Sequence, residues 1–575
     1  MFDLFKKIFN LSYVYDKFGV IKLNLILFFS SIIEGLSIAL IFPIVGIIAE
    51  NKNAQVFFDS IPFLQISSEN IIYSILILLI TIFLFKSLIL LYFSWWKSGF
   101  IKELNINFAR KIFSNYLRED LNFFLTNKPS ILLRNSFDEI RAFISSVDCF
   151  FKLLTEIVVF VMISLVLIYF QPKITLVMIF LFGISGFLFT IYTKNLLKNW
   201  SSKKLHYAGK LIQILQQSYE SIKYLKISGS ENKAITDYDK NIRQFSKYAR
   251  FALFFSDIPK NFLEFLGVLT LVFIIFFLFK FSNSDFQTIL PVLGLFAAAA
   301  FRIIPGINRI INLIQAIYST NASIKLVYSD LIKTRNIAED SKIKKTKFNL
   351  IKFKNVSYSY PNSNINVLKG INLEIKKNDC ICIIGSSGSG KTTIVDLIVG
   401  LLKPTSGKIT IDDKLLVSDQ DVKNWQRNIG YIPQNTTLYN TTILENITYG
   451  KNFSEINKDS LDKAIKYAQL ENFIYNQPGG LNYKISERGS NLSGGQMQRF
   501  AIARSLYLNP EILICDEFTS SLDENTEDRI LDSLNNLVGN TTMVFISHNN
   551  KIIKKAHKII QIRKNKEGVE IIKND

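Results

Sequence analysis

The sequence predicts two domains of different kinds: an α-helical membrane domain with six transmembrane helices, followed by an α/β domain with a phosphate-binding loop. Three observations support this prediction. Long apolar stretches fill the first part of the chain, a polar segment follows them at 331–348, and strand patterns then alternate with helix patterns. We therefore expect a membrane domain over 1–330, a linker over 331–348 and an α/β domain over 349–575.

The composition agrees with this division. Hydrophobic residues make up 49% of the chain, and 67 lysines and arginines against 47 acids give a formal net charge of +20. Such an excess in a soluble protein would favour a nucleic-acid partner. Basic loops on the cytoplasmic side of membrane helices produce the same excess. We therefore expect membrane lipid, and no nucleic acid, as a partner.

The six apolar stretches have the length of membrane spans. Each has about 18 residues or more, which is what an α-helix needs to cross a bilayer. Basic residues gather in 97–150 and 194–251, so we expect these segments, and both chain termini, in the cytoplasm. Apolar residues at i, i+3 and i+4 predict that the helices continue beyond the membrane. The predicted spans are 22–48, 71–94, 151–171, 174–194, 262–280 and 287–305.

Several ionisable residues interrupt the apolar stretches. They are costly in lipid and usually face a bundle interior or a cavity. They include Glu156 and Glu264. One interpretation is a cavity for a polar headgroup. One alternative is that Glu34 and Lys86 form a structural pair inside the bundle. Another is that Arg302 and Arg309 extend their charged ends to the membrane surface. The candidate substrate-binding residues are Glu34, Lys86, Arg302 and Arg309.

The run DCICIIGSSGSGKTTIVDLIVGLL predicts a strand, a glycine-rich loop and a helix. Glycines allow backbone N–H groups to surround phosphate oxygens, and the helix N-terminus adds positive potential. Lys391 is expected to reach the β- and γ-phosphates, and the Thr392 hydroxyl to hold Mg²⁺. The predicted nucleotide-binding residues in this run are Gly385, Ser386, Ser387, Gly388, Ser389, Gly390, Lys391, Thr392 and Thr393.

Two later strands end in residues suited to hydrolysis. EILICDE ends in Asp516, which can hold magnesium through water, and Glu517, which can orient or deprotonate the attacking water. TTMVFISHNN places His548 at a strand tip, where an imidazole could touch the γ-phosphate. The alternatives are solvated acids at the end of a strand and a structural histidine. The predicted catalytic residues are therefore Lys391, Glu517 and His548, with ATP and Mg²⁺ as cofactors.

The second half of the chain, 349–575, resembles the nucleotide-binding domain of ABC transporters. Leu492-Ser493-Gly494-Gly495-Gln496 matches the signature of that family. The resemblance implies that Tyr360 stacks on adenine and that Gln434 contacts the metal. Two such domains pair head to tail in this family. Ser493, Gly494, Gly495 and Gln496 would then close on ATP held by a second copy of the chain, so a homodimer is expected.

Six membrane helices followed by one such domain resemble the half-transporter plan of ABC exporters, with an α/β P-loop ATPase domain. Two coupling helices are then expected near 126–136 and 220–230. The full chain looks most like PglK-type flippases of lipid-linked oligosaccharides, and 51–66 like their external helix. This implies an ATP-driven flippase of a lipid-linked oligosaccharide or similar amphiphile in the bacterial inner membrane. The alternatives are an exporter of peptide, lipid or drug, and a non-transporting ATP-driven regulator.

Overall fold

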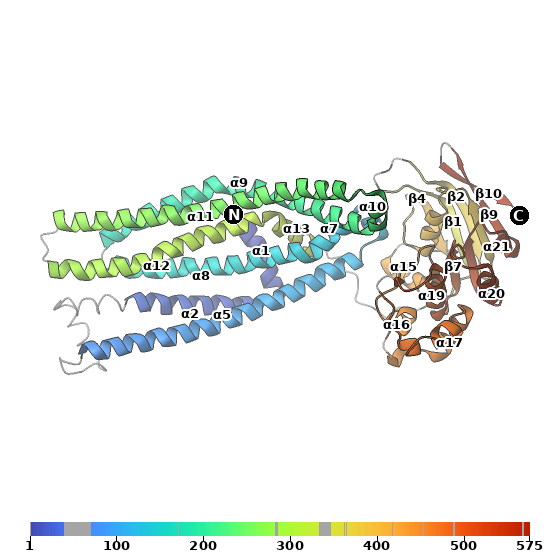
Figure 1. Cartoon of the computed structure of the whole chain (residues 1–575), viewed down its shortest axis with the longest axis horizontal. Helices are drawn as coiled ribbons and strands as arrows, with labels where there is room; N and C mark the ends of the chain where they lie inside the picture. The colour runs from blue at the N-terminus through green and yellow to red at the C-terminus, as the bar shows by residue number, and fades with distance from the viewer. Residues whose placement is uncertain are drawn as a thin grey trace. The chain divides into compact units, whose positions relative to one another are not determined.

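The chain forms two compact units (Figure 1). One comprises Met1–Arg118 and Asn127–Arg335, and the other comprises Glu119–Thr126 and Asn336–Asp575. The predicted external helix at 51–66, and most of the predicted linker at 331–348, lie outside the described residues. The computed structural model describes residues 2–39, 71–170, 172–281, 286–332 and 345–574, except 346, 362, 364, 417, 452, 487, 488, 566 and 567.

The described residues of the first unit are helical. Its helices are α1 (Phe2–Tyr15), α2 (Lys17–Ala39), α5 (Ile71–Leu117), α7 (Pro129–Arg134), the π-helix η1 (Asn135–Glu139), α8 (Ile140–Phe170), α9 (Pro172–Glu220), α10 (Ile222–Ser228), α11 (Glu231–Phe281), α12 (Phe286–Ser319) and α13 (Asn321–Ile332). The described part of each predicted membrane span falls on α2, α5, α8, α9, α11 or α12.

Three of these helices are much longer than a membrane is thick. α5, α9 and α11 have 47, 49 and 51 residues. At about 1.5 Å per residue each is about 70–77 Å long, whereas the hydrocarbon core of a bilayer is about 30 Å thick. The predicted continuation of the helices beyond the apolar stretches is therefore confirmed. In the described part of the chain, three helical segments are long and apolar enough to cross a membrane: Ile80–Leu117, Pro129–Tyr169 and Thr175–Glu220.

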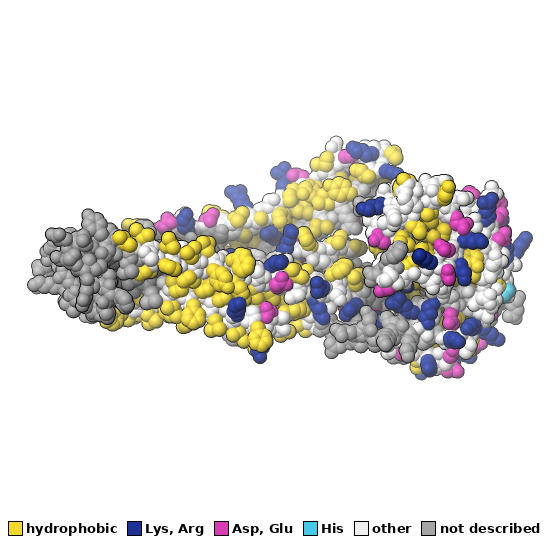
Figure 2. Space-filling view, turned by 90° about the horizontal axis from the view of Figure 1, so that it is seen from below, with side chains coloured by type: hydrophobic (Ala, Val, Ile, Leu, Met, Phe, Trp, Pro, Cys, Tyr) yellow, Lys and Arg dark blue, Asp and Glu magenta, His cyan; other side chains and the backbone are white. Residues whose placement is uncertain are grey.

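The long helices pack into a bundle with an apolar outer surface. α9 lies beside α11, and α8 lies beside α2 and α12. Val159, Phe182 and Ile307 belong to a core shared by these helices. Hydrophobic side chains also cover much of the outer face of the bundle (Figure 2). Leu91 and Phe187, for example, are 67% and 65% exposed. Such a surface suits contact with lipid chains.

The second unit contains two sheets. An antiparallel sheet has the order β2-β1-β4-β5, and a six-stranded sheet has the order β10-β9-β3-β8-β7-β6. In the larger sheet only β10 is antiparallel to its neighbour. The strands are β1 (Leu350–Tyr358), β2 (Leu368–Lys376), β3 (Cys380–Gly385), β4 (Ser406–Ile411), β5 (Lys414–Leu415), β6 (Ile429–Ile432), β7 (Ile512–Asp516), β8 (Thr542–Ile546), β9 (Lys558–Asn565) and β10 (Gly568–Asn574).

Helices cover these sheets. They are α6 (Leu121–Thr126), α14 (Lys391–Val399), α15 (Asp419–Gln426), α16 (Ile443–Thr448), the 3₁₀ helices η2 (Phe453–Glu455) and η3 (Gly480–Asn482), α17 (Lys458–Tyr467), α18 (Glu471–Tyr475), α19 (Gly494–Tyr507), α20 (Glu524–Asn535) and α21 (Asn550–Lys555). All residues of β7 and β8 are buried, and all are apolar except Thr542 at the start of β8 and Asp516 at the end of β7.

The parallel strands place their ends at one edge of the sheet. β3 ends at Gly385, β7 at Asp516 and β8 at Ile546, and all three run in the same direction. Open α/β sheets bind their ligands outside the carboxyl ends of parallel strands. This edge therefore holds the candidate site.

A short segment from early in the chain belongs to the second unit. Leu121 packs against its hydrophobic core, and the buried Tyr358 hydroxyl donates a hydrogen bond to Asn122 Oδ1 over 2.9 Å. The first coupling helix was predicted near 126–136, and α7 lies within that region. Pro129 begins α7, since proline is well suited to the first turn of a helix, and its turns continue through η1 into α8. α10 (Ile222–Ser228) lies within the second expected region.

Candidate nucleotide-binding site

The glycine-rich loop joins β3 to α14, as the sequence predicts. Gly388 and Gly390 have φ angles of +73° and +84°, which glycine adopts readily. A Cβ atom at Gly385 would lie 2.6 Å from the Ile562 carbonyl oxygen and 2.7 Å from Ser389 Oγ. The loop is therefore closely packed against β9, and glycine is required where its backbone turns.

The polar groups of this loop suit an anion. The Ser389 side chain is buried, and its Oγ has no hydrogen-bond partner. Lys391 is also buried, and its Nζ donates to the carbonyl oxygens of Gly385 and Ser386 over 2.7 and 3.2 Å. Among the described residues no carboxylate forms an ion pair with Lys391. A buried ammonium held by neutral carbonyls, beside an unpaired hydroxyl, fits a phosphate group.

The two predicted acids end up in different surroundings. Asp516 is buried at the end of β7, and Tyr431 donates a hydrogen bond to its Oδ2 over 3.4 Å. Burial, followed by the charge of Glu517, raises the pKa of Asp516 above its usual value. A bound cation would favour the charged carboxylate. Glu517 is half-buried and has a φ of +44°, an uncommon angle for a residue with a side chain.

Gln434 and Glu517 are far apart in the sequence but meet in the structure. Gln434 follows β6, and its Nε2 donates to Glu517 Oε2 over 2.7 Å. Thr392 is exposed in the first turn of α14. In the part of the chain that the structure describes, no group of three or more His, Cys, Asp or Glu side chains is placed to hold a metal ion. The oxygen atoms of Thr392, Gln434 and Asp516 are of the kind that Mg²⁺ prefers.

His548 and Tyr360 lie next to the glycine-rich loop. His548 follows β8, its side chain is exposed, and its Nε2 lies 3.4 Å from Lys391 Nζ. The Tyr360 hydroxyl and Thr393 Oγ1 share a hydrogen bond of 3.0 Å. Two predicted residues from separate motifs, His548 and Tyr360, therefore each contact the first residues of α14.

One acid in this region was missed in the sequence. Asp396 lies on α14, and burial, followed by the charge of Asp516, raises its pKa to about 6. The signal was present, because Asp396 interrupts the apolar run IVDLIV of the helix after the glycine-rich loop.

The signature residues form a structure of their own. Ser493 caps the N-terminus of α19: its Oγ accepts from the Gln496 N–H, and its own N–H donates to Gln496 Oε1. A Cβ at Gly495 would lie 3.0 Å from the Ser521 carbonyl oxygen, so this loop packs closely on the segment after β7. Backbone N–H groups at a helix N-terminus can bind an anion.

The four predicted substrate residues are not all described. Arg309 on α12 forms a two-point ion pair with Glu156 on α8: its Nε lies 2.7 Å from Oε1, and its Nη2 lies 3.2 Å from Oε2. The side chains of Glu34 and Arg302 lie outside the described residues. Lys86 is half-buried, with its Nζ 5.1 Å from the centre of the Phe83 ring.

Together, the glycine-rich loop, the acids at the strand ends and the helical bundle define a membrane protein with a P-loop nucleotide-binding domain. Residues 368–520 match the ABC transporter family, and residues 23–302 match the ABC transporter transmembrane region. The chain therefore belongs to the ABC transporters and has the exporter arrangement, a helical transmembrane domain followed by an ATP-binding domain.

Known relatives match different shares of the chain. An ABC transporter B family member 29 of Arabidopsis thaliana, described as chloroplastic, is 37% identical over 37% of this chain, which spans only 33% of that relative. An ATP-dependent lipid A-core flippase of Ralstonia nicotianae is 26% identical over 79% of this chain and 77% of its own length. A similar flippase of Chromobacterium violaceum is 33% identical over 48% of this chain and 46% of its own length.

The fold also matches a solved structure. A bacterial Atm1-family ABC exporter with ATP bound superimposes with a TM-score of 0.78, over 94% of this chain and 93% of that chain. The sequence identity is 20%, so this likeness concerns the fold.

Proposed function

We propose that the chain is one half of a homodimeric, ATP-driven flippase, which moves a lipid-linked oligosaccharide or a similar amphiphile across the bacterial inner membrane. The observation that carries the proposal is the convergence of Lys391, Gln434, Glu517 and His548 at one edge of a parallel sheet. The proposal keeps both termini in the cytoplasm and the domain boundaries at 1–330, 331–348 and 349–575.

Each side chain at the site has a distinct task in this proposal. Lys391 and the amides of the glycine-rich loop bind the β- and γ-phosphates, and Tyr360 stacks on adenine. Thr392, Gln434 and Asp516 would hold Mg²⁺, which would supply positive charge to the phosphates when bound. Glu517 orients the attacking water and accepts its proton, while the hydrogen bond from Gln434 holds the carboxylate in place. His548 lies beside Lys391, where it can contact the γ-phosphate.

A second copy of the chain would complete the site. Each chain has one glycine-rich loop and one signature, and Ser493, Gly494, Gly495 and Gln496 would close on the nucleotide of the other chain. An exposed apolar surface on α10 supports an assembly of two chains. Tyr224 and Ile227 are 71% and 88% exposed there, on a helix that lies between the long extensions of α9 and α11. A partner that covered these side chains would remove apolar area from water.

The proposed cargo follows from the kind of relative that the chain matches. Two of those relatives are named lipid A-core flippases, and a lipid with a sugar headgroup is the chemistry they share with a lipid-linked oligosaccharide. The exposed apolar surface of the bundle also suits a cargo that stays in contact with the bilayer. Export of a peptide, another lipid or a drug is the alternative.

Reconstitution into liposomes tests the proposal. Vesicles with the full chain should move a labelled lipid-linked oligosaccharide between leaflets when Mg-ATP is present. Vesicles with Glu517→Gln should not, because hydrolysis is blocked. Movement of a lipid A-type lipid or a labelled peptide, with no movement of the oligosaccharide lipid, would contradict the proposed cargo. Failure to hydrolyse ATP would contradict the proposal that ATP hydrolysis drives the movement.

A further inference from the structure

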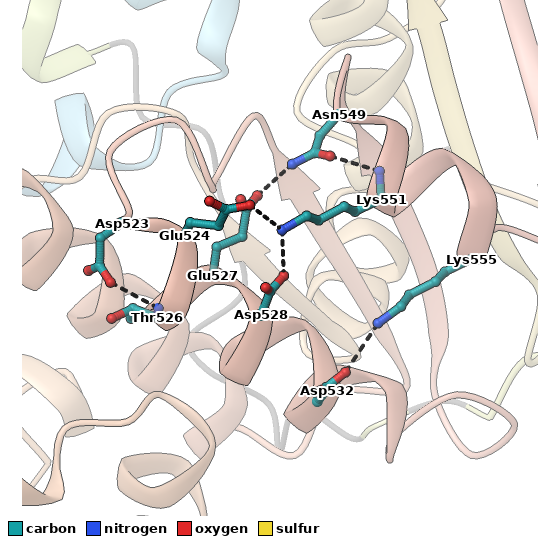
Figure 3. Close-up of polar contacts among 9 residues, drawn as sticks. All are labelled: Asp523, Glu524, Thr526, Glu527, Asp528, Asp532, Asn549, Lys551 and Lys555. Atoms are coloured by element: carbon teal, nitrogen blue, oxygen red, sulfur yellow. Dashed lines mark hydrogen bonds and ion pairs between the residues drawn. The ribbon is translucent and has the colours of Figure 1, made fainter.

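Two helices that begin at the candidate site are joined side by side (Figure 3). α20 follows β7 and the segment Ser520–Asp523, and α21 follows β8 and His548. Acids on α20 face amide and ammonium groups at α21. The contacts are Asn549 with Glu527, Lys551 with Glu524 and Asp528, and Lys555 with Asp532.

Asn549 is fixed from three directions. Its Nδ2 donates to Glu527 Oε1 over 2.6 Å, and its Oδ1 accepts from the Lys551 N–H over 2.8 Å. Its own N–H donates to Oγ of the buried Ser547 over 3.0 Å. Ser547 and Asn549 are the two neighbours of His548. The backbone on both sides of the histidine is therefore held, while the imidazole itself stays exposed toward Lys391.

The contact between Asn549 and Glu527 differs from the lysine pairs. Both residues are half-buried, and the acceptor is a carboxylate, which makes a hydrogen bond shorter and stronger. Lys555 and Asp532 have side chains that are 40% and 77% exposed. Exposed ion pairs of this kind contribute about 0–1 kcal/mol. Glu527 is therefore the main connection between α20 and the histidine.

The segment just before α20 packs against the signature loop, residues 492–496. Asp523 caps its N-terminus by accepting from the Thr526 N–H over 3.0 Å. Just before this cap, the Ser521 carbonyl oxygen and Leu522 pack against Gly495. The position of Glu527 is therefore fixed relative to the signature loop of its own chain.

We infer that Glu527 and Asn549 are positioning residues for His548. They hold the peptide around the histidine so that the imidazole stays beside Lys391. The inference rests on the proposed ATPase activity, to which it adds two residues. Misplacing a catalytic group by about 1 Å can lower a rate roughly 100-fold, so a loss of this contact should reduce turnover.

The test uses full-length protein in lipid nanodiscs, with kcat and KM measured for Mg-ATP. Asn549→Ser keeps a hydroxyl that can cap α21 but has no amide to donate to Glu527. Glu527→Ala removes the acceptor from the other side. We expect each variant to lower kcat roughly 10- to 100-fold while KM changes by less than about threefold. Lys555→Met, the matched control, should keep the parent kcat.

Two further comparisons separate positioning from a general loss of structure. In a His548→Ala background, Asn549→Ser should cause no further fall in kcat, because the group it positions is absent. Glu527→Gln retains an acceptor oxygen and should recover most of the kcat that Glu527→Ala loses. An equal fall in the His548→Ala background, or no recovery by glutamine, would overturn the inference.

The result also distinguishes the inference from the proposed function. A parent that hydrolyses ATP at the same rate as Asn549→Ser contradicts the positioning role alone. A parent that hydrolyses no Mg-ATP contradicts the proposed function, and the positioning role with it.

Discussion

One charged side chain in each unit illustrates a difference in how its charge is satisfied. In the helical unit, Arg309 and Glu156 satisfy each other with two hydrogen bonds. In the ATP-binding unit, Lys391 Nζ contacts two carbonyl oxygens and the His548 imidazole but forms no ion pair with a carboxylate among the described residues, and Ser389 Oγ is buried without a partner. A completed pair stabilises a bundle, whereas incomplete polar groups are costly until a ligand completes them. The difference indicates that the charges of Arg309 and Glu156 support the fold, whereas the charge of Lys391 is available to bind a ligand.

The largest effect should come from the site. Glu517→Gln keeps the size of the side chain but removes the proton acceptor, so hydrolysis should fall about 10²- to 10⁴-fold while ATP still binds. Phosphate release and binding of labelled ATP to the purified full chain measure the two properties. Glu471→Gln, an exposed acid at the start of α18, is the control and should have no effect. Near-normal hydrolysis by Glu517→Gln would place the proton acceptor elsewhere.

An intermediate effect should come from the helical pair. Glu156→Gln or Arg309→Met leaves one charge without its partner. Breaking a buried pair costs about 3–5 kcal/mol, and because the Arg309 side chain is 42% exposed we expect about 1–3 kcal/mol. Unfolding of the protein in detergent measures the loss, and the double variant should recover much of it.

The same variants test the alternative role of Arg309 in substrate binding. If Arg309→Met leaves stability unchanged but abolishes stimulation of the ATPase by the cargo, Arg309 serves the cargo and the comparison between the units fails. Strictly additive losses of stability in the double variant would likewise show that Glu156 and Arg309 do not support each other.

The smallest effect should come from Asp396, a charge that the ATP-binding unit leaves uncompensated. Its pKa is raised from 3.8 to about 6 in the folded protein. Well below pH 3.8 the carboxyl is protonated in both states. As the pH rises from about 4 to 6, the unfolded chain releases this proton first, so the folded state loses stability. Asp396→Asn should therefore stabilise the unit at pH 7.5. We expect a gain of about 1–2 kcal/mol, a value already reduced because the side chain is partly exposed to solvent.

Thermal unfolding with the metal chelated measures this effect. The gain from Asp396→Asn should be present at pH 7.5 and much smaller at pH 4. An equal gain at both values would mean that the charge of Asp396 is not its cause.

The sequence predicts the ATP-binding fold well because its signals are local. A strand, a glycine-rich loop and a helix follow one another between Cys380 and Val399, and their backbone needs are visible in the residue types. Contacts between distant segments are different. The bond between Gln434 and Glu517 depends on how β6 and β7 pair, which neither motif encodes alone.

The helical unit shows the same limit. The sequence offered a structural pair of Glu34 and Lys86 as one possibility, and this stays a prediction because the Glu34 side chain lies outside the described residues. The pair of Glu156 with Arg309 was not predicted, because it depends on the packing of α8 against α12. Helix periodicity shows which residues share a face, but it does not determine which neighbour covers that face. Partner choice among helices of similar hydrophobicity therefore could not be predicted from local patterns.

The membership of α6 in the second unit has a consequence for biosynthesis. At about 5–20 residues per second, the roughly 200 residues between Thr126 and Asn336 take about 10–40 s to translate. During that time the nascent chain presents Leu121 and Asn122 before the strand that carries Tyr358 has left the ribosome. The contacts of Leu121 and Asn122 in the second unit therefore join a peptide made early to a strand made after most of the membrane helices.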